Sequence, residues 1–405
     1  MNCFLQLVGF EYKKIAKRRG ALLALALALI TTILLPLGTL IGSVYEDGAP
    51  VETQYAAMQT DRAYARALSG RPIDAALLME AAAAYAQVPD STRYTQTPEY
   101  KTHARPYSEI YGIARAVYNT ASQRFNMEDF QSLSAEQAAS FYALRQDQQA
   151  NLLAQYPMSE RAKSELTALD AQVETPFRYS YYGGYQRFLG ILYTVGLLLA
   201  FSVSVCIAPL FAGEYTSGAD QLLLSARHGK GKLIGAKLFT GFSLTAAASL
   251  VLTGLTYLTC MLAFGPDGVH APIQLMLPLC AYPLTFGQAA LIFSLCVLLA
   301  ALMTSALTML LSARMKSPFG VIILISVLLV APMYIRVPVT MPGLYNLVQL
   351  LPSNMMERPN VFDTMQFELF GLVLHPWQAM LLAAGAVTVL LTPFAIRAFK
   401  RHQIC

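Results

Sequence analysis

The chain has 405 residues, of which 55% are hydrophobic and only 13% are charged, and its formal net charge is +5. A soluble chain normally has about 25% charged residues. The composition therefore argues against a soluble protein and favours an integral membrane protein.

Six long apolar stretches contain no Lys, Arg, Asp, Glu or His. They cover residues 21–44, 188–211, 238–263, 285–311, 318–335 and 376–396. A helix needs about 20 apolar residues to cross a bilayer core, and a charge at its centre costs about 2.5 to 3.5 kcal/mol. The sequence therefore predicts an all-α integral membrane protein with six transmembrane helices.

Basic residues gather in the N-terminal segment, in the loops after the second and fourth spans, and in the C-terminal tail. They are Lys13, Lys14, Lys17, Arg18, Arg19, Arg227, Lys230, Lys232, Lys237, Arg314, Lys316, Arg397, Lys400 and Arg401. Because positive residues are retained on the cytoplasmic side, we predict a multi-pass protein of the cell membrane with both termini in the cytoplasm. Its basic charge follows from this topology, so no nucleic-acid partner is predicted.

Residues 1–19 precede the first span, which we place at 20–44. Apolar residues at helical spacing predict one face of a helix, and most of the lysines lie on the other; the apolar set is Phe4, Leu7, Val8, Tyr12 and Ile15. We interpret the segment as a cytoplasmic interfacial helix in contact with membrane lipid. An ordinary basic flank is the alternative. A cleavable signal peptide is disfavoured because the apolar region is too long.

Residues 45–187 differ from the spans, being polar and rich in Ala, Gln, Tyr and Arg. They predict a large helical extracytoplasmic domain between the first two spans, with helices near 53–69, 73–88, 107–120, 135–156 and 159–173. No cysteine falls in this domain, which excludes a disulfide framework there. Residues 188–405 then carry spans two to six.

Two further segments are apolar but do not fit a simple span. Residues 273–284 contain Pro278 and Pro283, and we interpret them as a short re-entrant piece before the fourth span. The outer loop 336–375 alternates apolar and polar clusters. We expect it either to dip into the outer leaflet or to form an amphipathic cap on the membrane surface.

The loop at 212–237, on the cytoplasmic side, is the most informative segment. Glu214 stands at the membrane exit, Gly218 permits a turn, and a basic glycine-containing turn leads into the third span. Between them, Leu222, Leu223 and Leu224 are expected to face the cytosol. Three leucines in a short soluble loop require a partner surface, either lipid or protein.

This loop resembles the one joining the second and third spans in permease subunits of ATP-binding-cassette (ABC) transporters of the type-2 exporter family, found in bacteria. The matching positions are Glu214, Gly218, Leu223, Leu224, Ser225, Lys230, Ile234 and Lys237. The sequence departs from the family pattern at Ala226, Arg227 and His228, where Pro and a larger apolar residue are common.

The resemblance implies that residues 214–232 form a coupling helix docked on an ABC ATPase subunit. The implied coupling residues are Glu214, Gly218, Leu222, Leu223, Leu224, Ser225, Lys230 and Lys237. It also implies a second permease copy or paralogue and export of a substrate such as a peptide, a lipid-like molecule or a drug. The alternative for the loop itself is a charged topology anchor.

Motifs for other chemistry are missing from the sequence. No G-x-x-x-x-G-K-(S/T) phosphate loop is present, so ATP and Mg²⁺ are expected on the partner subunit and no cofactor on this chain. The five histidines are scattered, and no metal site or catalytic residue is predicted. A secondary transporter would need a carboxylate or histidine within a span. A membrane sensor or scaffold displaying the outer domain, and a force-transmitting ABC permease that moves no substrate across the bilayer, remain alternatives.

Overall fold

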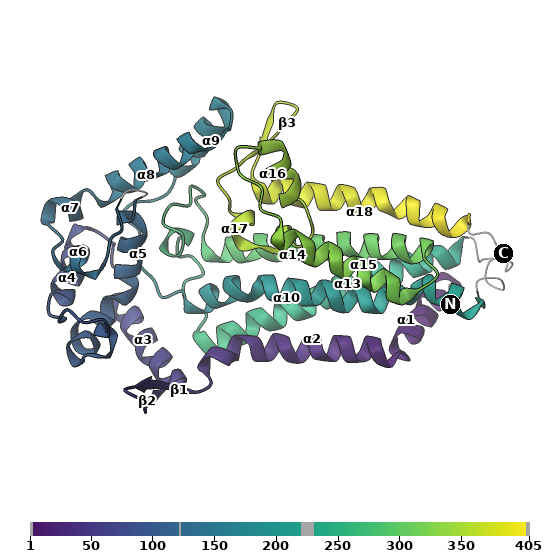
Figure 1. Ribbon diagram of the computed structural model, residues 1–405, viewed down its shortest axis with the longest axis horizontal. Coiled ribbons are helices and arrows are strands. Elements are labelled where there is room, and N and C mark those ends of the chain that lie inside the picture. The colour runs from purple at the N-terminus through teal and green to yellow at the C-terminus, as the bar shows by residue number, and fades with distance from the viewer. Residues whose placement is uncertain (1–2, 121–122, 220–230, 402–405) are drawn as a thin grey trace.

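The computed structural model describes residues 3–120, 123–219 and 231–401. It is elongated, with a bundle of long helices in one half and a group of shorter helices in the other (Figure 1). Within the described residues, five helices are long and apolar enough to cross a membrane. The prediction of a mostly helical membrane protein is therefore confirmed.

The five helices match five of the six predicted spans. They are α2 (Arg19–Leu37, continued by a 3-10 turn Gly38–Leu40), α10 (Gly183–Ile207, continued by Ala208–Leu210), α13 (Lys232–Phe264), α14 (Phe286–Arg314) and α18 (Pro376–Lys400). The stretch predicted as the fifth span forms α15 (Pro318–Val330) with a 3-10 turn Ala331–Tyr334. It is apolar but shorter than the others. A sixth crossing therefore stays a prediction.

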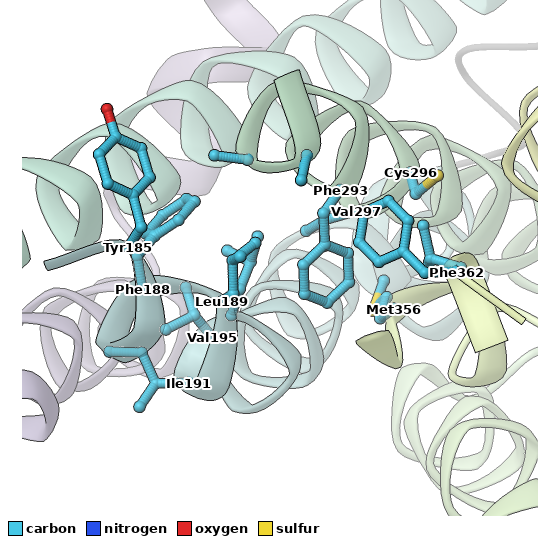
Figure 2. Packing of buried hydrophobic residues seen from close by; sticks show 14 of the residues in the cluster. Tyr185, Phe188, Leu189, Ile191, Val195, Phe293, Cys296, Val297, Met356 and Phe362 are labelled. Carbon is cyan, nitrogen blue, oxygen red and sulfur yellow. The ribbon is translucent and has the colours of Figure 1, made fainter. Parts of the chain in front are cut away.

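The core of the bundle lies where α10 and α14 meet. α10 packs against α2, α13 and α14, and α14 packs extensively along α18. Figure 2 shows buried side chains of α10, among them Phe188 and Val195, together with Phe293 and Val297 of α14 and Met356 of the outer loop 336–375. All five side chains are buried. Because a bilayer supplies no hydrophobic drive between helices, this close packing holds the bundle together.

The insert, residues 45–187, is helical as predicted. Its helices are α3 (Gln54–Leu68), α4 (Ala75–Tyr85), α5 (Ser108–Tyr118), α6 (Met127–Gln131), α7 (Ala135–Ala139), α8 (Phe141–Gln155) and α9 (Glu160–Asp170), with short turns at Tyr94–Gln96, Tyr100–Ala104 and Arg105–Tyr107. Side-chain caps at Thr53, Asp74, Ser134 and Ser159 begin four of them. The helix predicted over 135–156 is divided at Ser140 into α7 and α8.

Two small hairpins depart from the all-α prediction. β1 (Ser43–Glu46) pairs with β2 (Ala49–Thr53), and β3 (Phe367–Leu369) pairs with β4 (Leu372–Leu374). In the first, Asp47 and Gly48 have φ values of 47° and 83°. Asp-Gly is a strong signal for a two-residue hairpin turn, so this element could have been found from the sequence. The first span ends at Leu40, short of the predicted residue 44, because the chain enters this hairpin.

Ion pairs and hydrogen bonds join the insert to the bundle. Arg66 of α3 donates to Asp267, in the loop after α13, over 2.8 Å. Arg145 of α8 donates to the carbonyl oxygens of Pro278 and Cys280. The segment 273–284, predicted as a re-entrant piece, therefore lies against the insert, and its one short helical turn is Ile273–Leu275.

The outer loop 336–375 folds over the same end of the bundle. It contains α16 (Pro342–Gln349), a 3-10 turn Asn354–Met356, α17 (Arg358–Val361) and the β3–β4 hairpin. At the opposite end lie α1 (Cys3–Ala16), α11 (Ala212–Ser217) and the end of α18 (Figure 1). These three elements bring together segments that are far apart in the sequence.

Candidate functional site

Charged side chains from α1, α11 and α13 meet at the end of the bundle away from the insert. Glu11 and Lys14 come from α1, Glu214 from α11 and Lys237 from the second turn of α13. Glu11 and Lys237 are 0% exposed and Glu214 is 5% exposed. Buried charges persist only when paired and hydrogen-bonded, so the arrangement of these four residues is a specific feature of the fold.

Lys237 is the centre of the cluster. Its Nζ atom donates to Glu214 Oε1 at 2.5 Å, to the carbonyl oxygen of Leu210 at 2.7 Å and to Glu11 Oε1 at 3.2 Å. An ammonium group has three protons to donate, and all three therefore have acceptors. The same Nζ lies 5.6 Å from the centroid of the Phe211 ring, so the aromatic face adds a favourable contact.

Lys14 forms the second bridge between the two acids. Its Nζ donates to Glu214 Oε1 at 2.8 Å and to Glu11 Oε1 at 3.0 Å. Burial by itself would lower the pKa of this ammonium, but the hydrogen bond and charge of Glu214 and the charge of Glu11 outweigh it and raise the pKa above the usual value. Lys14 is therefore positively charged at neutral pH, and two acids face two lysines.

Helix α11 is positioned by contacts at both of its ends. The backbone N–H groups of Phe211 and Ala212 donate to Ser312 Oγ of α14, and this hydroxyl donates to the carbonyl of Ala208. Ser312 therefore caps a helix to which it does not belong. Gly218 ends α11 with φ of 69°, a conformation that glycine adopts at low cost.

Contacts with α14 and α18 also hold α11 in place. The hydroxyl of Tyr215 donates to the carbonyl of Ala313 at 3.0 Å, and its ring stacks on Phe399 of α18. Phe211 also contacts the Phe399 ring, with 5.0 Å between centroids. As a result, α11 contacts α1, α13, α14 and α18, and a displacement of α11 would act on all four.

A cavity of about 260 Å³ adjoins the cluster. Its lining includes Glu11, Lys14, Arg18 and Glu214. The Oε2 atoms of Glu11 and Glu214 are buried and have no hydrogen-bond partner among the described residues. Each carboxylate can accept further hydrogen bonds, so two residues that line the cavity have an unused acceptor each. A larger cavity of about 900 Å³ lies between the insert and the bundle, but its charged lining residues, such as Arg178 and Glu174, are exposed.

Three of the eight predicted coupling residues lie in the described part of the chain. Glu214 and Lys237, 23 residues apart, form a direct ion pair, and Gly218 forms the C-cap of α11. Neither charged side chain is free on the surface to bind a partner. The other five lie outside the described residues: Leu222, Leu223, Leu224, Ser225 and Lys230.

Sequence reasoning missed Glu11, Lys14 and Ser312 as members of this site. One signal was available for Glu11, because it follows Leu7 and Val8 at helical spacing and precedes Ile15 on the same apolar face. The structure buries Val8, Glu11 and Ile15 together, which supports the predicted apolar face. Lys14 was placed among the lysines mostly opposite the apolar face, and its side chain in the structure bonds to Glu214. No local pattern distinguishes Ser312 from the other hydroxyls of α14.

Comparison with known proteins gives one match. The family model described as "ABC-2 family transporter protein" matches residues 29–392. No curated protein and no solved structure matches the chain. The matched range includes α11, α13 and most of α18, and it begins within α2, so α1 with Glu11 and Lys14 precedes it.

Proposed function

The chain belongs to the family of ABC-2 transporter proteins, and we propose that it couples ATP hydrolysis on a partner subunit to export of a substrate. The chain is a membrane permease component, and members of this family are not themselves catalytic. ATP and Mg²⁺ would be bound by the partner ATPase. The substrate is a peptide, a lipid-like molecule or a drug, and a second permease copy or paralogue would complete the pathway.

The buried Glu214–Lys237 pair is the observation that supports coupling. Glu214 begins and Lys237 follows the segment 214–232 that resembles a coupling helix. Both are tied to α1 through Glu11 and Lys14. A force that an ATPase applied between residues 219 and 231 would therefore reach a charge cluster that α1, α11 and α13 share.

In this proposal the clustered residues position the loop and do not dock on the ATPase. Glu214 and Lys237 are buried against their own chain, so the docking contacts would come from Leu222, Leu223 and Leu224. The cytoplasm would lie at the end with α1, α11 and the end of α18. That end includes Lys13, Lys17, Arg314 and Arg397, as the positive-inside rule requires.

Co-purification with the ATPase subunit tests the proposal. Leu223→Ser with Leu224→Ser is expected to reduce recovery of the ATPase without changing membrane insertion, because the apolar docking surface is removed. Glu214→Gln should also weaken association, by loosening α11. Lys163→Ala on the insert is the matched control and should retain the ATPase. Full recovery with both test variants, or nucleotide hydrolysis by the purified chain alone, would rule the proposal out.

The contacts between insert and bundle favour a second candidate function, force transmission without substrate passage. Arg66 and Arg145 attach the insert to the ends of α13 and α14, so motion of the bundle would move the insert. Substrate transport assayed in proteoliposomes separates the two functions. ATP-dependent movement of the insert with no flux of any peptide, lipid or drug tested would favour force transmission.

A further inference from the structure

The tip of the β3–β4 hairpin presents an aromatic side chain to the outside of the protein. Leu369 pairs with Leu372, so Phe370 and Gly371 form a two-residue turn. Phe370 is 97% exposed, more than any other large hydrophobic residue in the described chain. The two leucines beside it are 56% and 61% exposed. Among the residues that the structure describes, none covers the Phe370 side chain.

Local backbone chemistry does not explain Phe370. The residue has φ of 50° and Gly371 has φ of 79°, the pattern of a type I′ turn, which favours Asn or Asp before Gly. A bulky residue in this left-handed region is rare and strained. The β1–β2 hairpin has the same turn geometry, but there the first position is Asp47, with φ of 47°. Backbone preference favours Asn or Asp at the first turn position of both hairpins. The β1–β2 hairpin has Asp47 there, whereas the β3–β4 hairpin has Phe370.

The hairpin lies where the membrane surface is expected. β4 ends at Leu374 and the membrane-spanning helix α18 begins at Pro376. Trp377 contacts the rings of Tyr282 and His375 at centroid distances of 4.5 and 4.8 Å, and such aromatic groups mark a membrane interface. In Figure 1 the hairpin rises beside the bundle and not beyond its end. Its tip therefore points sideways, along the direction in which lipid surrounds the bundle.

Neighbouring surface is apolar as well. Leu344 and Leu347 of α16 and Met341 before it are exposed. Exposed apolar side chains are also present on α15 and α18, and such surface faces lipid in a membrane protein. A lipid surface is therefore the occupant that fits the hairpin tip.

The hairpin is attached to the insert at two points, one in strand β3 and one in the turn itself. Glu368 accepts a hydrogen bond of 2.8 Å from the backbone N–H of Ser159, at the start of α9. Arg161 donates to the carbonyl oxygen of Gly371 at 2.8 Å. The hairpin thus connects α9 to the start of α18, so its position relative to the bilayer also sets the position of α9.

We propose that the β3–β4 hairpin is a membrane anchor for the insert: Phe370, Leu369 and Leu372 enter the leaflet on the insert's side, and Glu368 and Arg161 attach α9 to this anchor. The proposal needs only that the bundle crosses a bilayer. It does not depend on coupling to an ATPase.

Tryptophan quenching in vesicles tests the anchor. The chain has a single tryptophan, so Phe370→Trp with Trp377→Phe gives one probe at the tip. The full-length protein is reconstituted in phosphatidylcholine vesicles with or without brominated acyl chains, and iodide is added as a quencher from water. Phe370→Trp should lose most of its emission to brominated lipid and little to iodide. Ala139→Trp with Trp377→Phe, which puts the probe on exposed α7 far from the bundle, is the control and should show the reverse.

Quenching of Phe370→Trp by brominated lipid no greater than that of the control would overturn the proposal. If iodide reaches the probe in that case, the tip is in water; if iodide does not, another protein surface covers it. Should Trp377→Phe unfold the chain, the same comparison is made with Trp377 kept and the wild-type signal subtracted.

A second variant separates anchoring from folding. Phe370→Asn suits the turn better than Phe, so the hairpin should still form. With a probe at Leu372→Trp, this change should reduce quenching by brominated lipid, because the main inserted side chain is gone. Unchanged quenching would show that Phe370 does not hold the hairpin in the leaflet.

Discussion

The carboxylate of Glu214 and the ammonium of Lys237 are 2.5 Å apart and buried, although 23 residues separate them in the chain. The pair joins α11, where the proposed coupling segment begins, to the first turns of α13, which follows that segment. Because Lys14 and Glu11 bond to the same two groups, the N-terminal helix takes part in the same contact. The three segments are therefore expected to move together.

Removing one charge from this cluster should destabilise the protein strongly. Lys237→Met leaves Glu11 and Glu214 with only the partly exposed Lys14, and loss of one buried partner typically costs about 3 to 5 kcal/mol. The double variant Lys237→Met, Glu214→Gln should recover part of this loss, because it restores the balance of charge. Unfolding midpoints in detergent micelles measure both effects. Glu165→Gln, which breaks the exposed pair with Arg161, is the control and should cost about 1 kcal/mol or less. Equal losses for the buried and exposed pairs would contradict the prediction.

Two glycines of α10 should respond differently to the same substitution. A Cβ atom at Gly184 would lie 2.1 Å from the carbonyl oxygen of Gly265, after the end of α13. Gly184→Ala should therefore force the two helices apart and cost about 1 to 3 kcal/mol, as overpacking does. Gly190→Ala in the same helix meets no atom within 4 Å and should be neutral or slightly stabilising. Thermal unfolding of the two variants makes the comparison, and equal midpoints would show that the close approach is absent.

Arg145 should control the segment between the insert and α14. Arg145 is 1% exposed, and its guanidinium donates to Asp170 and to the carbonyls of Pro278 and Cys280. Arg145→Met leaves a carboxylate and two carbonyls without this donor, so hydrogen exchange of amides in 278–284 should become faster. Arg145→Lys should give an intermediate rate, because it keeps the charge but lacks the planar fork.

Arg161→Met, an exposed arginine on α9, is the control for this exchange measurement. It should leave the amides of 278–284 protected. Protection that survives Arg145→Met would mean that the segment is held by its own contacts, such as the bond from Ile273 N–H to the Leu284 carbonyl.

The insert should lose stability in acid through Glu80. Hydrogen bonds from Arg71 and Tyr107 lower the pKa of this carboxyl to about 2, below its unfolded value of about 4.3. A lowered folded pKa means that the stabilisation is complete above the unfolded value and is lost as pH falls toward about 2. Glu80→Gln should therefore lower the unfolding midpoint at pH 7, and the difference from wild type should shrink as pH falls below about 4. A difference that does not change with pH would contradict this origin.

Local signals in the sequence were enough for most of the secondary structure. Hydropathy identified the five long membrane helices because a helix that crosses lipid must be apolar along about 20 residues. Composition predicted helices in the insert, and the structure shows Ser134 as the cap of one of them. The hairpin at Asp47 was missed although its turn signal was present, because the surrounding composition was read as helical.

Tertiary structure decided which charged residues form the site. From the sequence, Glu214 and Lys237 belong to a cytosolic loop and its flank, and Lys14 is one of several basic residues near the membrane. Only the packing of α1 against α13 brings Glu11 beside Lys237, and only the end of α14 supplies Ser312 as a cap for α11. The sequence by itself determined the helices, because hydropathy and capping act within about 20 residues. The charge cluster depends on contacts across more than 200 residues, which no local pattern records.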